Sequence, residues 1–114
     1  MFWKTTYGFF TKSITSLADD LSQVLQIKWQ ERDSDAWGDY YLYPPFQAGN
    51  SRQLKETFRL YLNHISFEGW KAPDFKDCGV LLSVTTERPL EIDKLLYSAL
   101  QEKIVLIQRS TLEG

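Results

Sequence analysis

The chain has 114 residues and a formal net charge of −2, and 43% of its residues are hydrophobic while 25% are charged. This length predicts one domain, and the composition excludes extended disorder, because long disordered segments are poor in apolar residues. The acidic balance argues against a nucleic-acid binder, which normally presents a basic surface to phosphate.

Cysteine usage and the apolar runs indicate the compartment. Cys78 is the single cysteine, so no intramolecular disulfide can form, which is typical of a reducing cytosol. Residues 1–10 lack the basic leader and the continuous apolar core of a signal peptide. No apolar run approaches the roughly 20 residues needed to span a bilayer. We therefore expect a cytoplasmic protein without a membrane segment.

The first part of the chain predicts a strand, a helix and a hairpin. Residues 2–10 are rich in aromatic residues and threonine, which favours a short strand or an extended arm. From Ser13 to about Gln26, apolar residues recur every three or four positions, as on an amphipathic helix. Residues 27–43 alternate between apolar and polar side chains on either side of an acidic turn, and Pro44 ends this predicted hairpin.

The second part predicts two strands, a helix and a last strand. Residues 57–65 alternate strictly, which places Phe58, Leu60 and Leu62 toward the core. Residues 66–77 read as a long loop. Residues 80–84 are apolar on both faces and predict a central strand. A helix should then begin at Pro89 and end near residue 102, a short strand should span 104–108, and the chain from Thr111 should be a frayed tail.

This order of elements predicts an α+β two-layer sandwich. We expect a mainly antiparallel sheet of about four to six strands with the two helices on one face. Residues 80–108 read as strand, helix and strand, so the last strand is expected to lie parallel to one neighbour.

Residues 33–43 are the segment richest in functional groups, since three carboxylates and four aromatic rings lie within it. The acids come first, then Gly38, which permits a tight bend, and then an alternating run. The alternation predicts that Tyr40 and Leu42 face the core. It places Asp39, Tyr41 and Tyr43 on the outer face.

We find no catalytic, cofactor or metal signature. Asp33, Asp35 and Asp39 do not match a calcium loop of the EF type, because no glutamate closes the loop. His64 is the only histidine and is expected on the inward face of its strand. Its pairing with Cys78 as base and nucleophile is a remote alternative to a structural role for both residues. We expect a protein without enzymatic activity or cofactor.

Two interpretations of the acidic residues remain. In the first, the aspartates only bond to their own backbone in a turn. In the second, they form a negative patch with Glu68, Asp74 and Asp77, flanked by aromatic residues of the kind enriched at binding hot spots. On the second interpretation, the predicted partner-binding residues are Asp33, Asp35, Trp37, Asp39, Tyr41, Tyr43, Trp70 and Asp74. The competing expectation is that at least half of the tryptophans and tyrosines fill the core.

One sequence pattern resembles a known family. Leu17-Ala18-Asp19-Asp20-Leu21 is followed by Glu31-Arg32-Asp33-Ser34 and Trp37-Gly38-Asp39-Tyr40-Tyr41, and then by an apolar strand, a short helix and a last strand. This layout resembles small bacterial immunity proteins of polymorphic-toxin and contact-dependent inhibition systems. The resemblance implies a cytoplasmic inhibitor that binds a cognate toxin domain, often a nuclease, without activity or cofactor of its own. The alternative is a general interaction module or a self-associating scaffold.

Overall fold

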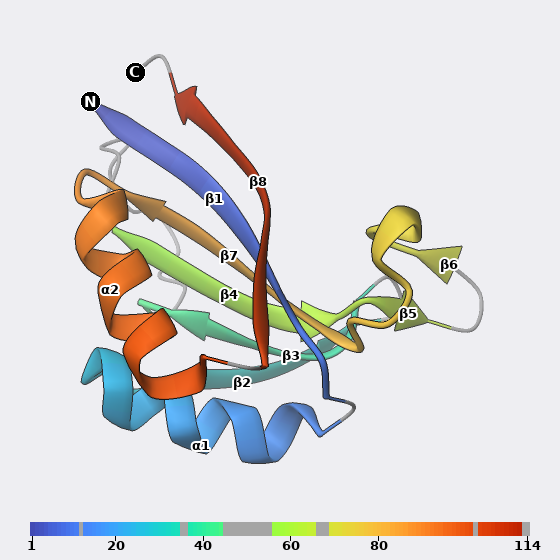
Figure 1. Cartoon of the computed structure of the whole chain (residues 1–114). Coiled ribbons are helices and arrows are strands. Elements are labelled where there is room, and N and C mark those ends of the chain that lie inside the picture. Colours follow the sequence, from blue (N-terminus) through green and yellow to red (C-terminus); the bar gives the residue numbers. More distant parts are fainter. Residues whose placement is uncertain (12, 35–36, 45–55, 66–68, 102, 113–114) are drawn as a thin grey trace.

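The fold is an α+β sandwich with both helices on one side of the main sheet. A computed structural model of the protein describes residues 1–11, 13–34, 37–44, 56–65, 69–101 and 103–112. Its elements are, in chain order, β1 (Phe2–Phe9), α1 (Ile14–Leu25), β2 (Gln30–Ser34), β3 (Gly38–Tyr43), β4 (Thr57–Leu62), β5 (His64–Ile65), β6 (Gly69–Trp70), the 3₁₀ turn η1 (Pro73–Phe75), β7 (Val80–Thr86), α2 (Pro89–Leu100) and β8 (Ile104–Leu112). Six strands form the main sheet, β5 and β6 form a separate pair, and α1 and α2 cover the same face (Figure 1). The predicted fold class is confirmed.

The main sheet has the order β2-β3-β4-β7-β1-β8, and each of these neighbours pairs antiparallel. β7 lies inside the sheet, where Leu82 pairs with Leu60 of β4 and with Tyr7 of β1. Its side chains are buried on both faces at Leu81 and Leu82. This agrees with the prediction of a central strand for an apolar run of this kind.

β1 is the element that the sequence placed least well. It lies between β7 and β8, so these two strands run in the same direction but are not neighbours. The expectation that the last strand is parallel to a neighbour is therefore wrong. The expectation of a frayed tail is also wrong for Thr111 and Leu112, since β8 continues to Leu112, which pairs with Phe2. A register shift opposite Thr6 and Tyr7 lets both Leu106 and Arg109 face the helices.

The helices cover the core with the predicted apolar stripes. Ser13 caps α1, and its side chain accepts a hydrogen bond from the backbone N–H of Ser16 at 3.3 Å. α2 begins at Pro89, which suits the first turn because no helical partner exists there for a backbone N–H. The buried helical residues are Leu17, Ala18 and Leu21 of α1 and Ile92, Leu96 and Leu100 of α2. They pack on Tyr7, Phe9, Phe58, Leu60, Leu82 and Val84 of the sheet.

Between β4 and β7 the chain leaves the main sheet, and we call residues 63–65 and 69–79 the excursion (Figure 1). The strand predicted over 57–65 ends at Leu62, because the buried Asn63 redirects the chain. The Asn63 amide nitrogen donates to the carbonyls of Phe75 and Cys78 at 3.0 and 2.8 Å, and its oxygen accepts from the N–H of Ala72 at 2.7 Å. One side chain thus satisfies three backbone groups of the excursion.

The redirection at Asn63 also decides the position of His64. We expected His64 to point inward as the next member of the alternating run, and this is wrong, since the residue is exposed. Its ring lies 4.6 Å from the ring of Trp70, across the β5–β6 pair. The long loop predicted over 66–77 contains β6 and η1 in its described part.

Candidate functional site

The β2–β3 hairpin lies at one edge of the main sheet and carries the acidic segment. Gly38 has a φ of 65°, a conformation that glycine adopts without strain, and pairs with Ser34 where the hairpin closes. The Ser34 hydroxyl also accepts a hydrogen bond from the N–H of Trp37 at 3.0 Å. Among the described strands β2 pairs with β3 alone, so its outer edge faces away from the sheet.

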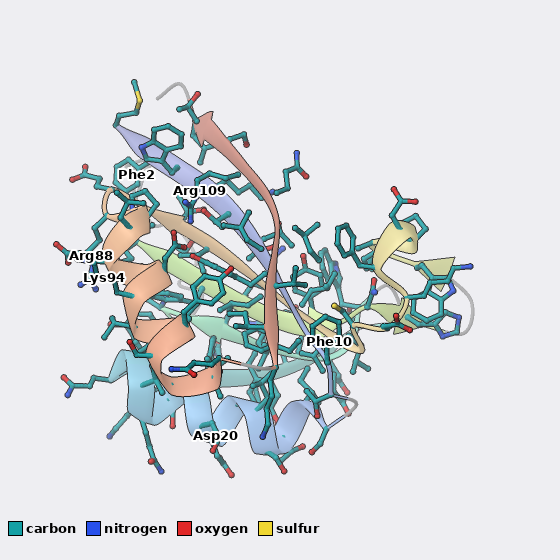
Figure 2. All side chains as sticks on the ribbon, viewed as in Figure 1. Phe2, Phe10, Asp20, Arg88, Lys94 and Arg109 are labelled. Carbon is teal, nitrogen blue, oxygen red and sulfur yellow. The ribbon has the colours of Figure 1, made fainter. Side chains whose placement is uncertain are left out.

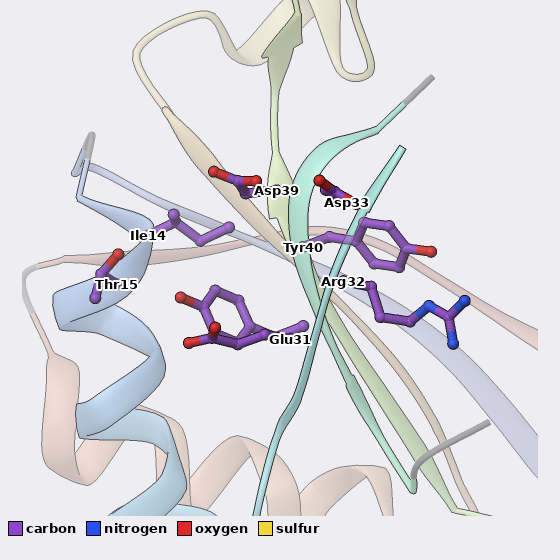
Figure 3. Close-up of a pocket in the computed structure, with 8 residues that line it drawn as sticks. Ile14, Thr15, Glu31, Arg32, Asp33, Asp39 and Tyr40 are labelled. Atoms are coloured by element: carbon purple, nitrogen blue, oxygen red, sulfur yellow. The ribbon is translucent and has the colours of Figure 1, made fainter. Parts of the chain in front are cut away.

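Alternation along the hairpin divides its side chains between two faces. Glu31 pairs with Tyr41 and Asp33 with Asp39, and these four residues lie on the side of α1. Arg32 pairs with Tyr40, and Figure 3 shows both on the other side of the strands, away from Thr15 of α1. The alternation therefore correctly predicted which residues of the hairpin share a face.

The assignment of faces was wrong. Tyr41, expected on the outer face, is only 8% exposed and belongs to the main core, where its ring packs edge-on against Trp29. Tyr43 is half-buried and packs against the same core. Tyr40 and Leu42, expected in the core, are half-buried on the opposite face of the sheet, where Tyr40 packs against the small cluster of Tyr61, Cys78 and Leu81. The helices cover the face that contains Tyr41, so Tyr41 is buried although it was expected to be exposed.

The acidic side chains surround a hollow of about 430 Å³ between the start of α1 and the hairpin (Figure 3). Its lining is Ile14, Thr15, Glu31, Arg32, Asp33, Asp39, Tyr40 and Tyr41. We call Glu31, Asp33 and Asp39 the acidic rim. Glu31 was missed as a site residue, although its position two residues before Asp33 on the same strand places both on one face.

The electrostatics of the acidic rim are unfavourable within the chain itself. Asp33 and Asp39 are opposed in register on neighbouring strands, and directly opposed like charges destabilise a sheet. Within the described residues, neither these two nor Glu31 forms an ion pair. All three are exposed, so the rim presents negative charge to solvent, and Arg32 is the cationic side chain in the lining of the hollow.

The structure does not gather the other predicted site residues at this rim. Trp37 lies on the opposite face of the sheet, where it contacts Tyr61 and Arg59. Trp70 and Asp74 belong to the excursion. Asp35 and Glu68 lie outside the described residues. Of the eight predicted partner-binding residues, the hairpin brings Asp33 and Asp39 together at an accessible surface.

Cys78 and His64 do not form a reactive pair in this arrangement. The Cys78 side chain is fully buried, packed with Leu81 and Tyr61, whereas His64 is exposed. Burial raises the pKa of the Cys78 thiol, and the neighbouring Asp77 charge raises it further, so the reactive thiolate is disfavoured. In the described part of the chain, no cluster of three or more histidine, cysteine or acidic side chains could hold a metal ion.

Comparison with known proteins leaves the site to be interpreted from its own chemistry. No described helix has both the length and the apolar character required to cross a membrane. No protein-family model matches the sequence, and a search of curated proteins finds no match.

Proposed function

We propose that the protein is a non-catalytic immunity protein that binds a cognate bacterial toxin domain through the acidic rim and blocks it. The observation that carries this proposal is the Asp33–Asp39 pair. The two residues are paired in register across the hairpin, and neither forms an ion pair in the described chain. The sequence resemblance noted above supplies the class of partner.

The cost of this pair to folding supports a binding role. Cross-strand pairs change sheet stability by roughly 0.2–1 kcal/mol, and a like-charge pair lies on the unfavourable side of that range. Local features that oppose stability without a compensating contact are concentrated at functional sites. A basic partner would supply the missing cation.

A toxin that cleaves nucleic acid is the partner class that this surface suits best. Such enzymes present basic clefts, because they must grip phosphate groups. Opposite potentials on two proteins raise their rate of encounter and suppress wrong partners. The acidic rim would occupy the cleft and exclude the nucleic acid, and neither a catalytic step nor a cofactor is required of the inhibitor.

The proposal predicts that a toxin domain is encoded beside the gene for this chain, and its test is binding to that domain. Replacing Asp33 and Asp39 with asparagine removes both charges at nearly constant shape. We expect the dissociation constant to rise about tenfold or more, because close charge pairs at an interface have coupling energies of roughly 1.5 kcal/mol or more. The matched control is Asp20→Asn with Glu87→Gln, which removes two exposed carboxylates away from the acidic rim.

Stability provides a second readout in the same variants. Relief of the repulsion should raise the unfolding free energy of the double asparagine variant by a few tenths of a kcal/mol, roughly the value of a cross-strand pair. Weaker binding combined with higher stability is the signature of a site maintained for a partner. Unchanged toxin affinity in the double asparagine variant would refute this location of the site.

A further inference from the structure

The face of the main sheet opposite the helices carries a groove of about 380 Å³. β1, β3, β4 and β7 contribute to its lining, which includes the cationic side chains of Lys4 and Arg59. No acidic residue belongs to the lining in the described chain. The polarity of this groove is therefore opposite to that of the acidic rim.

Cross-strand register explains how the sequence builds the groove. One row across the sheet contains Lys4, Thr85 and Thr57, and the next contains Ser83 and Arg59. Residues in one row point to the same face, so each cation has hydroxyl groups beside it. The two cations are two strands apart, or about 10 Å across the sheet. Hydroxyls between two cations form a surface suited to carboxylates.

Trp37 orients the cationic side of the groove. The Arg59 guanidinium carbon lies 5.0 Å from the centroid of the indole ring, and the Lys71 ammonium nitrogen lies 4.7 Å from it. The Tyr61 ring meets the indole edge-on at 4.9 Å, and the Tyr61 hydroxyl is hydrogen-bonded to Ser83 at 2.8 Å. A guanidinium held against an aromatic ring is pre-organised for a carboxylate, because less side-chain freedom is lost on binding.

We propose that this groove binds an extended acidic segment of a protein partner, with Arg59 and Lys4 pairing two carboxylates of that segment. Neither cation forms an ion pair within the described chain. Arg59 can hold a carboxylate through two parallel hydrogen bonds, and Thr57, Ser83 and Thr85 can donate further bonds. This surface is separate from the acidic rim and does not depend on the proposed toxin.

The contacts of the aromatic residues favour an acidic peptide over single-stranded nucleic acid. A base stacks on an aromatic ring with a free face, but Arg59 and Lys71 already lie over the ring of Trp37. Tyr61 is only 7% exposed and offers no platform. The net charge of −2 also opposes a long polyanion.

The test is a titration of the whole chain with a labelled dodecapeptide of alternating glutamate and threonine. Its matched control contains glutamine in place of glutamate, and an oligothymidylate of the same length is the nucleic-acid arm. Fluorescence anisotropy gives the affinity, and the indole N–H resonance of Trp37 reports the location. That resonance is assigned by its loss in Trp37→Phe.

We expect the glutamate peptide alone to bind and to shift the Trp37 resonance. Its affinity should fall about tenfold in Arg59→Gln combined with Lys4→Gln, and also when ionic strength rises from about 0.05 to 0.3 M. Arg59→Lys should retain part of the affinity. Lys94→Gln should retain all of it, because Lys94 lies on α2 at the opposite side of the sheet (Figure 2).

Three outcomes would overturn the proposal. Equal binding of the glutamate and glutamine peptides would show that charge does not matter. Unchanged affinity in the Arg59 and Lys4 double variant, with its fold verified by circular dichroism, would place the site elsewhere. Tighter binding of the oligothymidylate with the same Trp37 shift would assign the groove to nucleic acid instead.

Discussion

Gly8 occupies a point of β1 where no side chain fits. A Cβ built there would lie 2.6 Å from Cys78 Sγ and 2.9 Å from Ile107 Cδ1. Both neighbours belong to the small core under the excursion, and Cys78 is fully buried there. The close approach of β1 to the excursion therefore requires glycine at this position.

We predict that Gly8→Ala lowers the unfolding free energy by about 1–3 kcal/mol, the usual cost of overpacking a well-packed core. Urea denaturation followed by circular dichroism measures it. Cys78→Ala in the same chain removes the closest atom, so the double variant should be more stable than the sum of the two single effects predicts. Strict additivity would show that the two residues do not clash.

The residues of the hairpin show what alternation can and cannot predict. Period-two spacing correctly separated Tyr40 from Tyr41, because side chains on a strand alternate between faces. It could not say which face the helices cover. Both faces carry tyrosines, so hydrophobicity alone did not distinguish them, and the answer depends on the packing of α1 and α2.

At the scale of elements, a partly buried polar cluster joins α2 to β1 and β8. The Asp93 carboxylate accepts hydrogen bonds from the Tyr7 hydroxyl and from the Arg109 guanidinium. Arg109 also donates to the Thr5 hydroxyl at 3.0 Å, and Figure 2 shows Arg109 in the region where β8 faces α2. Burial, and then the hydrogen bond to Asp93, raise the pKa of Tyr7 above its ordinary value.

This raised pKa predicts a loss of stability in alkali. Above about pH 10 the unfolded chain releases the Tyr7 proton while the folded chain keeps it, so the unfolding free energy should fall by about 1.4 kcal/mol per pH unit. Burial also raises the pKa of Tyr61, which adds in the same direction. Tyr7→Phe should reduce the slope above pH 10, as measured by urea denaturation across that range. An unchanged slope would contradict the assignment to Tyr7.

Prediction of the elements succeeded where local signals were strong. Both helices carry apolar stripes with a capping Ser13 or an initial Pro89, and both were predicted within two residues. The insertion of β1 between β7 and β8 is a long-range pairing, which no local pattern specifies. The alternation of Phe58, Leu60 and Leu62 fails at His64, but the new direction of the chain depends on the tertiary hydrogen bonds of the Asn63 amide.

At the scale of the molecule, two surfaces of opposite charge lie on opposite sides of the sheet. The acidic rim opens beside α1, while Lys4 and Arg59 lie on the face without helices. The net charge of −2 does not reveal this separation, because it is the sum of the charges on both surfaces. Opposite surfaces on one chain also create the possibility of head-to-tail association, in which the rim of one copy enters the groove of the next.

We predict that the chain is nonetheless a monomer at physiological ionic strength. The edge strand β2 carries Glu31, Arg32 and Asp33 in succession, and charged edge strands resist pairing with a second sheet. Contacts between exposed charges across a shallow surface contribute only about 0–1 kcal/mol each and are screened over about 8 Å in such salt. Sedimentation equilibrium should give one species of 13.4 kDa. A larger species that dissociates in both Asp39→Lys and Arg59→Glu, and forms again when the two variants are mixed, would instead show self-association through these surfaces and favour a scaffold.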